Sequence, residues 1–249
     1  MAYTLADLRY RCRTMNRLAI VLALAATSGC KKSVKTAEVE TWMKARTTEL
    51  GINASKVTCP KDIEPKEGKS FDCELDVEGK AYTIVGTITK VESSKVNFDT
   101  SWKNGANGVI IRSKLVPALV EDLSKTFATK VDIACAEPLL FLDAKRAATC
   151  DLTAGTTKAK LVVTFDDKLA PTGWKLDPPL LAKTKLEELL TTAVREKTAP
   201  NVNVTCGTEP LIARPADGFL ACEAGDGTKK VQLKVEVDAD LNVKRWETI

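Results

Sequence analysis

Cysteine is the residue type in this sequence best suited to carry chemistry. The chain has eight cysteines and no histidine. Six of the cysteines form three pairs, each followed by a tryptophan: Cys59, Cys73 and Trp102; Cys135, Cys150 and Trp174; Cys206, Cys222 and Trp246. Successive tryptophans in this series lie 72 residues apart. This regular recurrence predicts three copies of one small domain.

A metal site, a redox pair and a structural disulfide are the three chemistries open to these cysteines. Zinc sites and redox pairs commonly use two cysteines that are only a few residues apart. Here the pairs enclose 13, 14 and 15 residues, which favours disulfides and predicts no metal site. Many pairings are open to six cysteines, but only pairing within each copy lets that copy fold alone. We therefore predict Cys59–Cys73, Cys135–Cys150 and Cys206–Cys222.

Disulfides persist in exported proteins, and residues 1–29 have the features of an export signal. Four arginines precede the apolar run from Leu18 to Ala26, and small residues follow it. A span across a bilayer takes about 20 apolar residues, so this run of nine favours a cleaved signal sequence. Translation can start at Met1 or at Met15.

The end of this segment, Thr27-Ser28-Gly29-Cys30 followed by Lys31, resembles a bacterial lipoprotein signal. The resemblance implies that Cys30 becomes the first mature residue and carries a lipid, which makes the membrane a partner. The basic residue after Cys30 is similar to lipoproteins sorted to the outer membrane. The expected location is the bacterial cell envelope, at the periplasmic face of the outer membrane or the cell surface. The alternative is an ordinary secretory signal in which Cys30 is incidental.

Charge excludes one class of partner. Loss of residues 1–29 removes four arginines and one aspartate, which changes the net charge from +4 to +1, with 33 basic and 32 acidic side chains remaining. The basic surface of a nucleic-acid-binding protein is therefore not expected.

The elements around the cysteines predict an α+β fold of three tandem repeats, each with one helix packed on a four-stranded antiparallel meander and one disulfide. Apolar residues at helical spacing open each copy, and alternating apolar residues follow around the cysteines. In the third helix, Thr184 and Glu187 have the spacing of a capping box. The predicted divisions are a signal sequence at 1–29, a tether at 30–35, and repeats at 36–103, 108–177 and 178–249.

Each copy has a Glu-Pro dipeptide between its cysteines: Glu64-Pro65, Glu137-Pro138 and Glu209-Pro210. Proline there indicates a turn. In the last two copies the dipeptide precedes apolar residues, namely Leu139, Leu140, Phe141, Leu142, Leu211 and Ile212. These are candidates for a partner-binding surface or for a short strand. Exposed apolar patches are uncommon in soluble domains, which favours the strand.

The repeated unit resembles the two-cysteine domains of unknown function found in bacterial secreted and lipid-anchored proteins. The resemblance rests on Val57-Thr58-Cys59, Ile133-Ala134-Cys135 and Val204-Thr205-Cys206, and on Phe71-Asp72-Cys73 for the second cysteine. A helix on such a sheet is also similar to cystatin and beta-lactamase-inhibitor folds.

The residue types give little support to catalysis. Without histidine, triads of serine or cysteine with histidine are excluded, and no glycine-rich phosphate loop occurs. Glu187 and Glu188 are acidic neighbours on a predicted helix surface, where charge usually serves solvation. We expect no catalytic residue, no cofactor and no enzymatic activity.

Two functions remain. The first is a lipid-anchored envelope protein whose tandem domains form a non-enzymatic binding or scaffold module for an envelope protein or polymer. The alternative is a secreted inhibitor of hydrolases, which acts through the loops between the paired cysteines.

Overall fold

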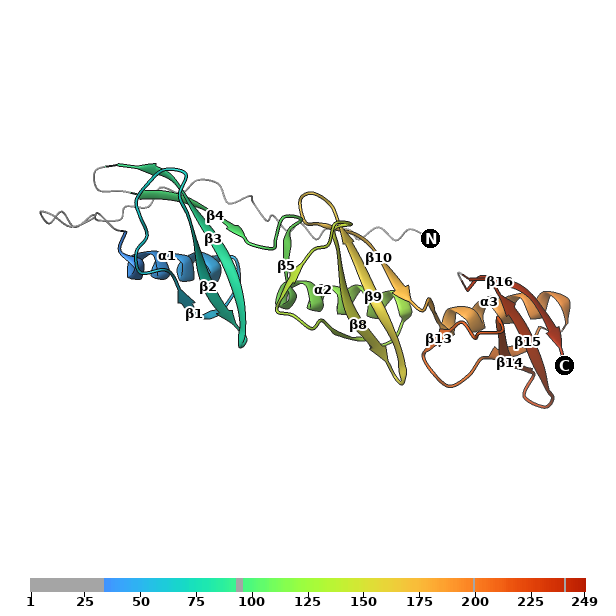
Figure 1. Cartoon of the computed structure of the whole chain (residues 1–249). Coiled ribbons are helices and arrows are strands. Elements are labelled where there is room, and N and C mark those ends of the chain that lie inside the picture. Colours follow the sequence, from blue (N-terminus) through green and yellow to red (C-terminus); the bar gives the residue numbers. More distant parts are fainter. Residues whose placement is uncertain (1–33, 93–95, 199, 240) are drawn as a thin grey trace, which may run out of the picture.

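A computed structural model describes residues 34–92, 96–198, 200–239 and 241–249. The predicted signal sequence, the predicted lipid attachment at Cys30 and most of the predicted tether lie outside these residues. The described chain folds into three units that follow one another in a row (Figure 1). None of the helices in the described ranges has the length and apolar character needed to cross a membrane.

Each unit contains one helix and one four-stranded antiparallel sheet, so the predicted fold class is confirmed. The first unit consists of α1 (Thr36–Glu49), β1 (Ala54–Thr58), β2 (Ser70–Val77), β3 (Lys80–Val91) and β4 (Val96–Trp102). The second has α2 (Arg112–Phe127), β6 (Asp132–Ala134), β8 (Ala147–Ala154), β9 (Thr157–Phe165) and β10 (Pro171–Asp177). The third has α3 (Lys183–Lys197), β12 (Asn203–Thr205), β14 (Phe219–Gly225), β15 (Lys230–Val237) and β16 (Val243–Thr248).

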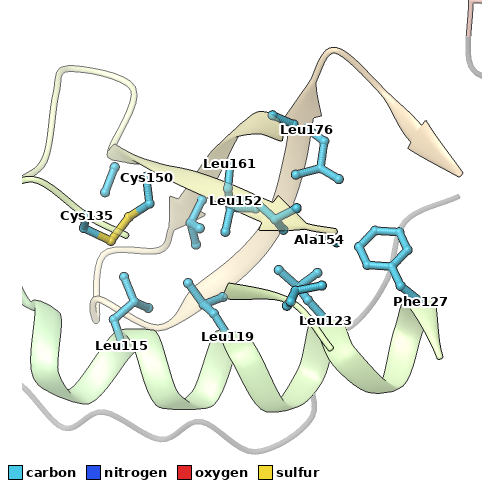
Figure 2. Close-up of a cluster of buried hydrophobic side chains, with 14 of the residues drawn as sticks. Leu115, Leu119, Leu123, Phe127, Cys135, Cys150, Leu152, Ala154, Leu161 and Leu176 are labelled. Atoms are coloured by element: carbon cyan, nitrogen blue, oxygen red, sulfur yellow. A yellow bond between two sulfur atoms is a disulfide. The ribbon is translucent and has the colours of Figure 1, made fainter. Parts of the chain in front are cut away.

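In each unit the helix packs on one face of the sheet. Figure 2 shows this core in the second unit, where α2 contributes four buried residues at helical spacing, Leu115, Leu119, Leu123 and Phe127. The sheet contributes the alternate residues that face the helix, including Cys150, Leu152 and Leu161. The helix residues that share one face, spaced three or four apart, and every second residue of the strands thus form one apolar layer.

The three predicted disulfides are present, as Cys59–Cys73, Cys135–Cys150 and Cys206–Cys222. Each joins the residue just beyond the first strand of a sheet to the middle of the second strand. Loops of this length stabilise a domain by about 3 kcal/mol in the chain-entropy account. Units of about 70 residues have small cores that give limited stability, so the disulfide of each unit adds stability that its core alone does not provide.

Two short two-stranded ribbons complete the fold. In the first, β5 (Val109–Ile111) pairs with β7 (Leu139–Phe141); in the second, β11 (Leu180–Ala182) pairs with β13 (Leu211–Ala213). The expectation of strands after the second and third Glu-Pro is therefore confirmed. These strands do not join the main sheets, however, because each pairs with the residues immediately before the helix of its own unit.

The equal spacing of the tryptophans does not follow the register of the sheets. Trp174 lies opposite Val163 and Trp246 opposite Val235, whereas Trp102 lies opposite Ile84. The residue of the first unit that matches the other two tryptophans is Thr100, opposite Gly86. The three units share one fold, but Trp102 and Trp174, which are 72 residues apart in sequence, occupy positions in their sheets that differ by two residues.

The predicted capping box in the third helix is wrong. Helix α3 begins at Lys183 without a side-chain cap, and the Glu187 carboxylate instead accepts a hydrogen bond from the Cys206 backbone N–H at 2.7 Å. Glu40 accepts the corresponding bond from the Cys59 N–H at 2.8 Å. In both units this glutamate ties the helix to the cysteine that follows the first strand.

Gly86 in β3 provides a test of the packing in the first core. A Cβ atom at this position would lie 2.4 Å from Cζ of Phe71, so Gly86→Ala would force the ring to move. We expect Gly86→Ala to lower the free energy of unfolding by about 1–3 kcal/mol, measured by chemical denaturation. Gly173→Ala is the matched control, because its Cβ would meet only Thr164 Oγ1 at 3.8 Å. Equal effects of the two substitutions would contradict this account.

Candidate functional site

Each two-stranded ribbon lies between two successive units. One face of the ribbon packs on the core of its own unit, and the other face packs on the core of the preceding unit. In β5 and β7 the central pair, Ile110 and Leu140, packs against the core of the second unit. The outer residues pack instead against the core of the first unit: Val109, Ile111, Leu139 and Phe141. Successive side chains of a strand point to opposite faces, so one ribbon is shared by two cores.

We call the contact between two successive units, built around one ribbon, a joint. In the first joint, aromatic side chains line the side that belongs to the first unit. The Phe141 ring stacks on Tyr82 of β3, with ring centroids 5.8 Å apart and an angle of 24° between planes. Trp102 of β4 meets the same ring edge-on, at 6.1 Å and 85°. Phe141 from the second unit therefore fills a corner made by the ends of two strands of the first unit.

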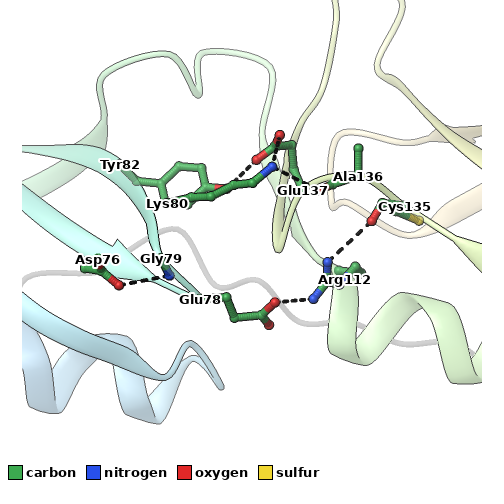
Figure 3. A network of polar contacts seen from close by, with 9 residues as sticks. All are labelled: Asp76, Glu78, Gly79, Lys80, Tyr82, Arg112, Cys135, Ala136 and Glu137. Atoms are coloured by element: carbon green, nitrogen blue, oxygen red, sulfur yellow. Dashed lines mark hydrogen bonds and ion pairs between the residues drawn. The ribbon is translucent and has the colours of Figure 1, made fainter.

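A polar network closes the rim of the joint (Figure 3). The Glu137 carboxylate accepts hydrogen bonds from Lys80 Nζ at 2.5 Å and from Tyr82 Oη at 2.8 Å. Lys80 also donates to the Ala136 carbonyl at 3.1 Å. Beside them, Arg112 at the start of α2 forms an ion pair with Glu78 in the β2–β3 turn. All of these bonds cross from one unit to the next.

The network shifts the acidity of two of its members. The hydrogen bond from Lys80, followed by the one from Tyr82, lowers the pKa of Glu137. Burial, followed by the hydrogen bond to Glu137, raises the pKa of Tyr82 to about 12. Glu137 is therefore held as the acceptor and Tyr82 as the neutral donor over the whole neutral range.

The second joint repeats the design with other donors. Leu211 and Ala182 of the second ribbon are 1% and 5% exposed and belong to the core of the second unit. Glu209 accepts a hydrogen bond from the Thr156 backbone N–H at 2.9 Å, where the first joint uses a lysine and a tyrosine. Thr157 Oγ1 donates to the Leu211 carbonyl at 3.0 Å.

The first unit has only a remnant of the ribbon. Val34, which falls within the predicted tether, forms a single β-bridge with Ile63, and both side chains are buried in their own core. This pairing makes Ile63 the counterpart of Leu140. The residues that flank the bridge on the outer face are charged and exposed: Lys35, Asp62 and Glu64.

It follows that the Glu-Pro of the first unit does not correspond to the other two. Glu64 comes after the bridging residue and pairs with Lys69 at 3.5 Å, whereas Glu137 and Glu209 come before their strands and bond to the preceding unit. Charged outer faces are what terminal units of a repeat array need for solubility. The first unit therefore has the surface of a terminal cap.

The six apolar residues proposed from sequence as a partner-binding surface lie in these joints and beside them. Leu139, Leu140, Leu142 and Leu211 are 1%, 7%, 4% and 1% exposed, and Phe141 and Ile212 are partly buried. The surface they bind is another part of the same chain, and little of them is left for an external partner.

The predicted lipid attachment at Cys30 lies outside the described residues. Within the described ranges, no group of acidic or cysteine side chains is arranged to hold a metal ion.

Sequence reasoning missed the other half of each ribbon, Val109–Ile111 and Leu180–Ala182. The available signal was a three-residue apolar run immediately before each helix. Such a run has no alternation because both of its faces are covered, which is the pattern of a fully buried strand.

Substitution of two neighbours in β7 tests whether the ribbon is shared. Leu139→Ala removes packing from the first core and Leu140→Ala from the second. Each should destabilise the unit it faces by about 2–5 kcal/mol. Residue-resolved hydrogen exchange should show faster opening of β2 and β3 for the first substitution, and of β8 and β9 for the second. Loss of protection confined to the second unit in both variants would contradict the shared ribbon.

The titration of Tyr82 tests the polar network. Tyr3, Tyr10 and Tyr82 are the tyrosines of the chain, so a chain that begins at Cys30 has only Tyr82. Tyrosinate absorbance should titrate with a pKa of about 12 and shift toward about 10, the ordinary value, in Glu137→Ala.

The sign of the linked stability follows from the direction of the shift. Because folding raises the pKa of the phenol, its contribution to stability is complete below about pH 10 and is lost as pH rises toward the folded value of about 12. Glu209→Ala, in the other joint, is the control and should leave the Tyr82 titration unchanged. A pKa near the ordinary value in the parent chain would refute the contact.

Comparison with known proteins adds a family match at one end of the chain. A family model described as a domain of unknown function (DUF4333) matches residues 19–93. The match spans most of the first unit and part of the predicted signal sequence, and it supports an unknown-function domain family for that stretch. No curated protein and no solved structure matches the chain.

Proposed function

We propose that this protein is a lipid-anchored component of a bacterial cell envelope, in which three tandem domains form a non-enzymatic scaffold or binding module for an envelope protein or polymer. The observation that carries the proposal is the shared ribbon. Each joint combines buried apolar residues with directed hydrogen bonds, as between Glu137 and Lys80 or Glu209 and Thr156. Such joints fix the units in a row, which suits a protein that presents surfaces at set positions.

The position of the first unit supports the anchoring part of the proposal. Val34 is already bound to Ile63, so only four peptide steps separate it from Cys30. At about 3.5 Å per residue, these steps span at most about 14 Å. A lipid on Cys30 would therefore hold the first unit at the membrane surface and direct the row away from it.

The alternative function, inhibition of a hydrolase by the loops after Pro138 and Pro210, has less support. A plug must enter another protein's cleft, and Leu139 and Leu211 are each only 1% exposed. Insertion of these residues elsewhere would require both joints to open.

Cys30→Ala tests the anchor. Without the acceptor thiol, we expect the protein to move from the membrane pellet to the soluble fraction of disrupted cells. Ser33→Ala is the control, because Ser33 is present whichever methionine starts the chain, and it should leave the protein in the pellet. A Cys30→Ala protein that stays in the pellet until detergent is added would refute lipid anchoring.

The binding role is tested with the soluble Cys30→Ala chain, which is mixed with purified cell-wall polymer or with solubilised envelope proteins. Saturable co-sedimentation or crosslinking with a defined component is the expected result. Substrate turnover by the purified chain, without such binding, would contradict a scaffold.

A further inference from the structure

The third unit presents, at its outer end, the same surface that the first unit uses to bind a ribbon. The registers of the three central hairpins place Ile84, Leu161 and Leu233 at one equivalent position, each opposite the cysteine of the second strand. Two residues earlier lie Tyr82, Ala159 and Val231, and two residues before those lie Lys80, Thr157 and Lys229. The hairpin of the third unit therefore corresponds in register to the two hairpins that accept ribbons as far as the pair Gly225–Lys230, and Lys229 lies in the turn next to this pair.

The third hairpin differs from the other two in how far the side chain at the second of these positions is exposed to solvent. Tyr82 is 9% and Ala159 is 6% exposed beneath their ribbons, whereas Val231 is 43% exposed. Val231 is on the sheet face that buries Leu233 and Val235, so alternation alone would place it in the core. Figure 1 shows the hairpin between β14 and β15 at the end of the row that points away from the second unit.

The polar part of the site is also present. Lys229 is exposed at the position from which Lys80 binds the Glu137 carboxylate. Two turn amides are satisfied within the hairpin, because Asp226 Oδ1 accepts from the Thr228 and Lys229 N–H groups at 2.9 Å and 2.8 Å. Asp76 plays the same part for Gly79 in the first unit, at 3.1 Å. The third hairpin therefore matches the first joint, in which a lysine side chain holds the carboxylate.

We infer that the hairpin face around Lys229 and Val231 is a binding site for an extended Glu-Pro-aliphatic segment of a partner polypeptide. The first joint supplies the carboxylate for the lysine, and both joints share the proline before the strand and the aliphatic residue next in sequence, Leu139 or Leu211, which is buried in the core of the preceding unit. This inference deepens the proposed scaffold function by naming the chemistry of its partner.

A second copy of this chain does not provide that segment at its free end. The outward residues of its first unit are Lys35, Asp62 and Glu64, where the binding ribbons have aliphatic and aromatic residues. Burial of these charges against Val231 would be unfavourable. The ribbons of the other two units are already covered.

The test is a titration of the isotopically labelled, soluble Cys30→Ala chain with a synthetic peptide of residues 207–213, which has the sequence Gly-Thr-Glu-Pro-Leu-Ile-Ala. We expect saturable shifts of the amide resonances of Lys229, Lys230 and Val231. Val231→Ser should weaken binding about tenfold through lost apolar contact, and Lys229→Ala about threefold through a lost exposed ion pair. A peptide with glutamine in place of glutamate should show the same threefold loss.

Leu189→Ser is the matched control, because Leu189 is 54% exposed on α3 and lies outside the hairpin. It should leave the affinity unchanged, and the dispersion of the amide spectrum reports that each variant is folded. Absence of saturable shifts at the hairpin, or equal affinity of the Val231→Ser and parent chains, would overturn the site. Shifts at the hairpin that depend on protein concentration without peptide would overturn the assignment to a different polypeptide. None of these results depends on the location of the Cys30→Ala chain in cells.

Discussion

A two-stranded ribbon with apolar side chains on both faces needs two cores to cover it. A ribbon of this size has little stability of its own in water, and alternation sends Leu139 and Leu140 to opposite sides. One unit covers one face, and the preceding unit covers the other. The core of the first unit is thus completed by residues of the second, and that of the second by residues of the third. The order of the units in the row follows from this single requirement.

Apolar burial brings the units together without fixing their orientation, because the hydrophobic effect has no direction. Hydrogen bonds have narrow geometry, and in each joint one glutamate is among the groups that form them across the two units. In the first joint that glutamate meets a lysine and a phenol, and in the second it meets a backbone N–H. The carboxylate is the common element, whereas its donors vary with the hairpin that faces it. This explains why Glu137 and Glu209 share a role that Glu64, on the other side of its β-bridge, does not have.

Features set by local periodicity could be predicted from the sequence. Phe71, Cys73, Leu75 and Val77 alternate and form one buried face of β2, and the cysteine spacing was sufficient to assign the disulfides. The ribbons were only half predicted, because a strand buried on both faces shows no alternation and its partner lies beyond a helix in sequence. The tryptophan period was misleading for a related reason. Trp102 serves the joint, against Phe141, whereas Trp174 packs near Phe127 within its own unit, and sequence spacing does not distinguish these two environments.

The joints give the row a direction. A ribbon on one side and a hairpin on the other make each contact heterologous, and contacts of this kind can continue without closing, which leads to filaments. The hairpin end of the third unit retains Lys229 and an exposed Val231. At the opposite end, Lys35, Asp62 and Glu64 replace the apolar residues that a ribbon would need. Burial of these three charges in an apolar contact is unfavourable, which disfavours binding of the first unit of one molecule to the third unit of another. The two ends of the described row therefore differ in chemistry, with an exposed apolar position at the hairpin end and charged residues at the other.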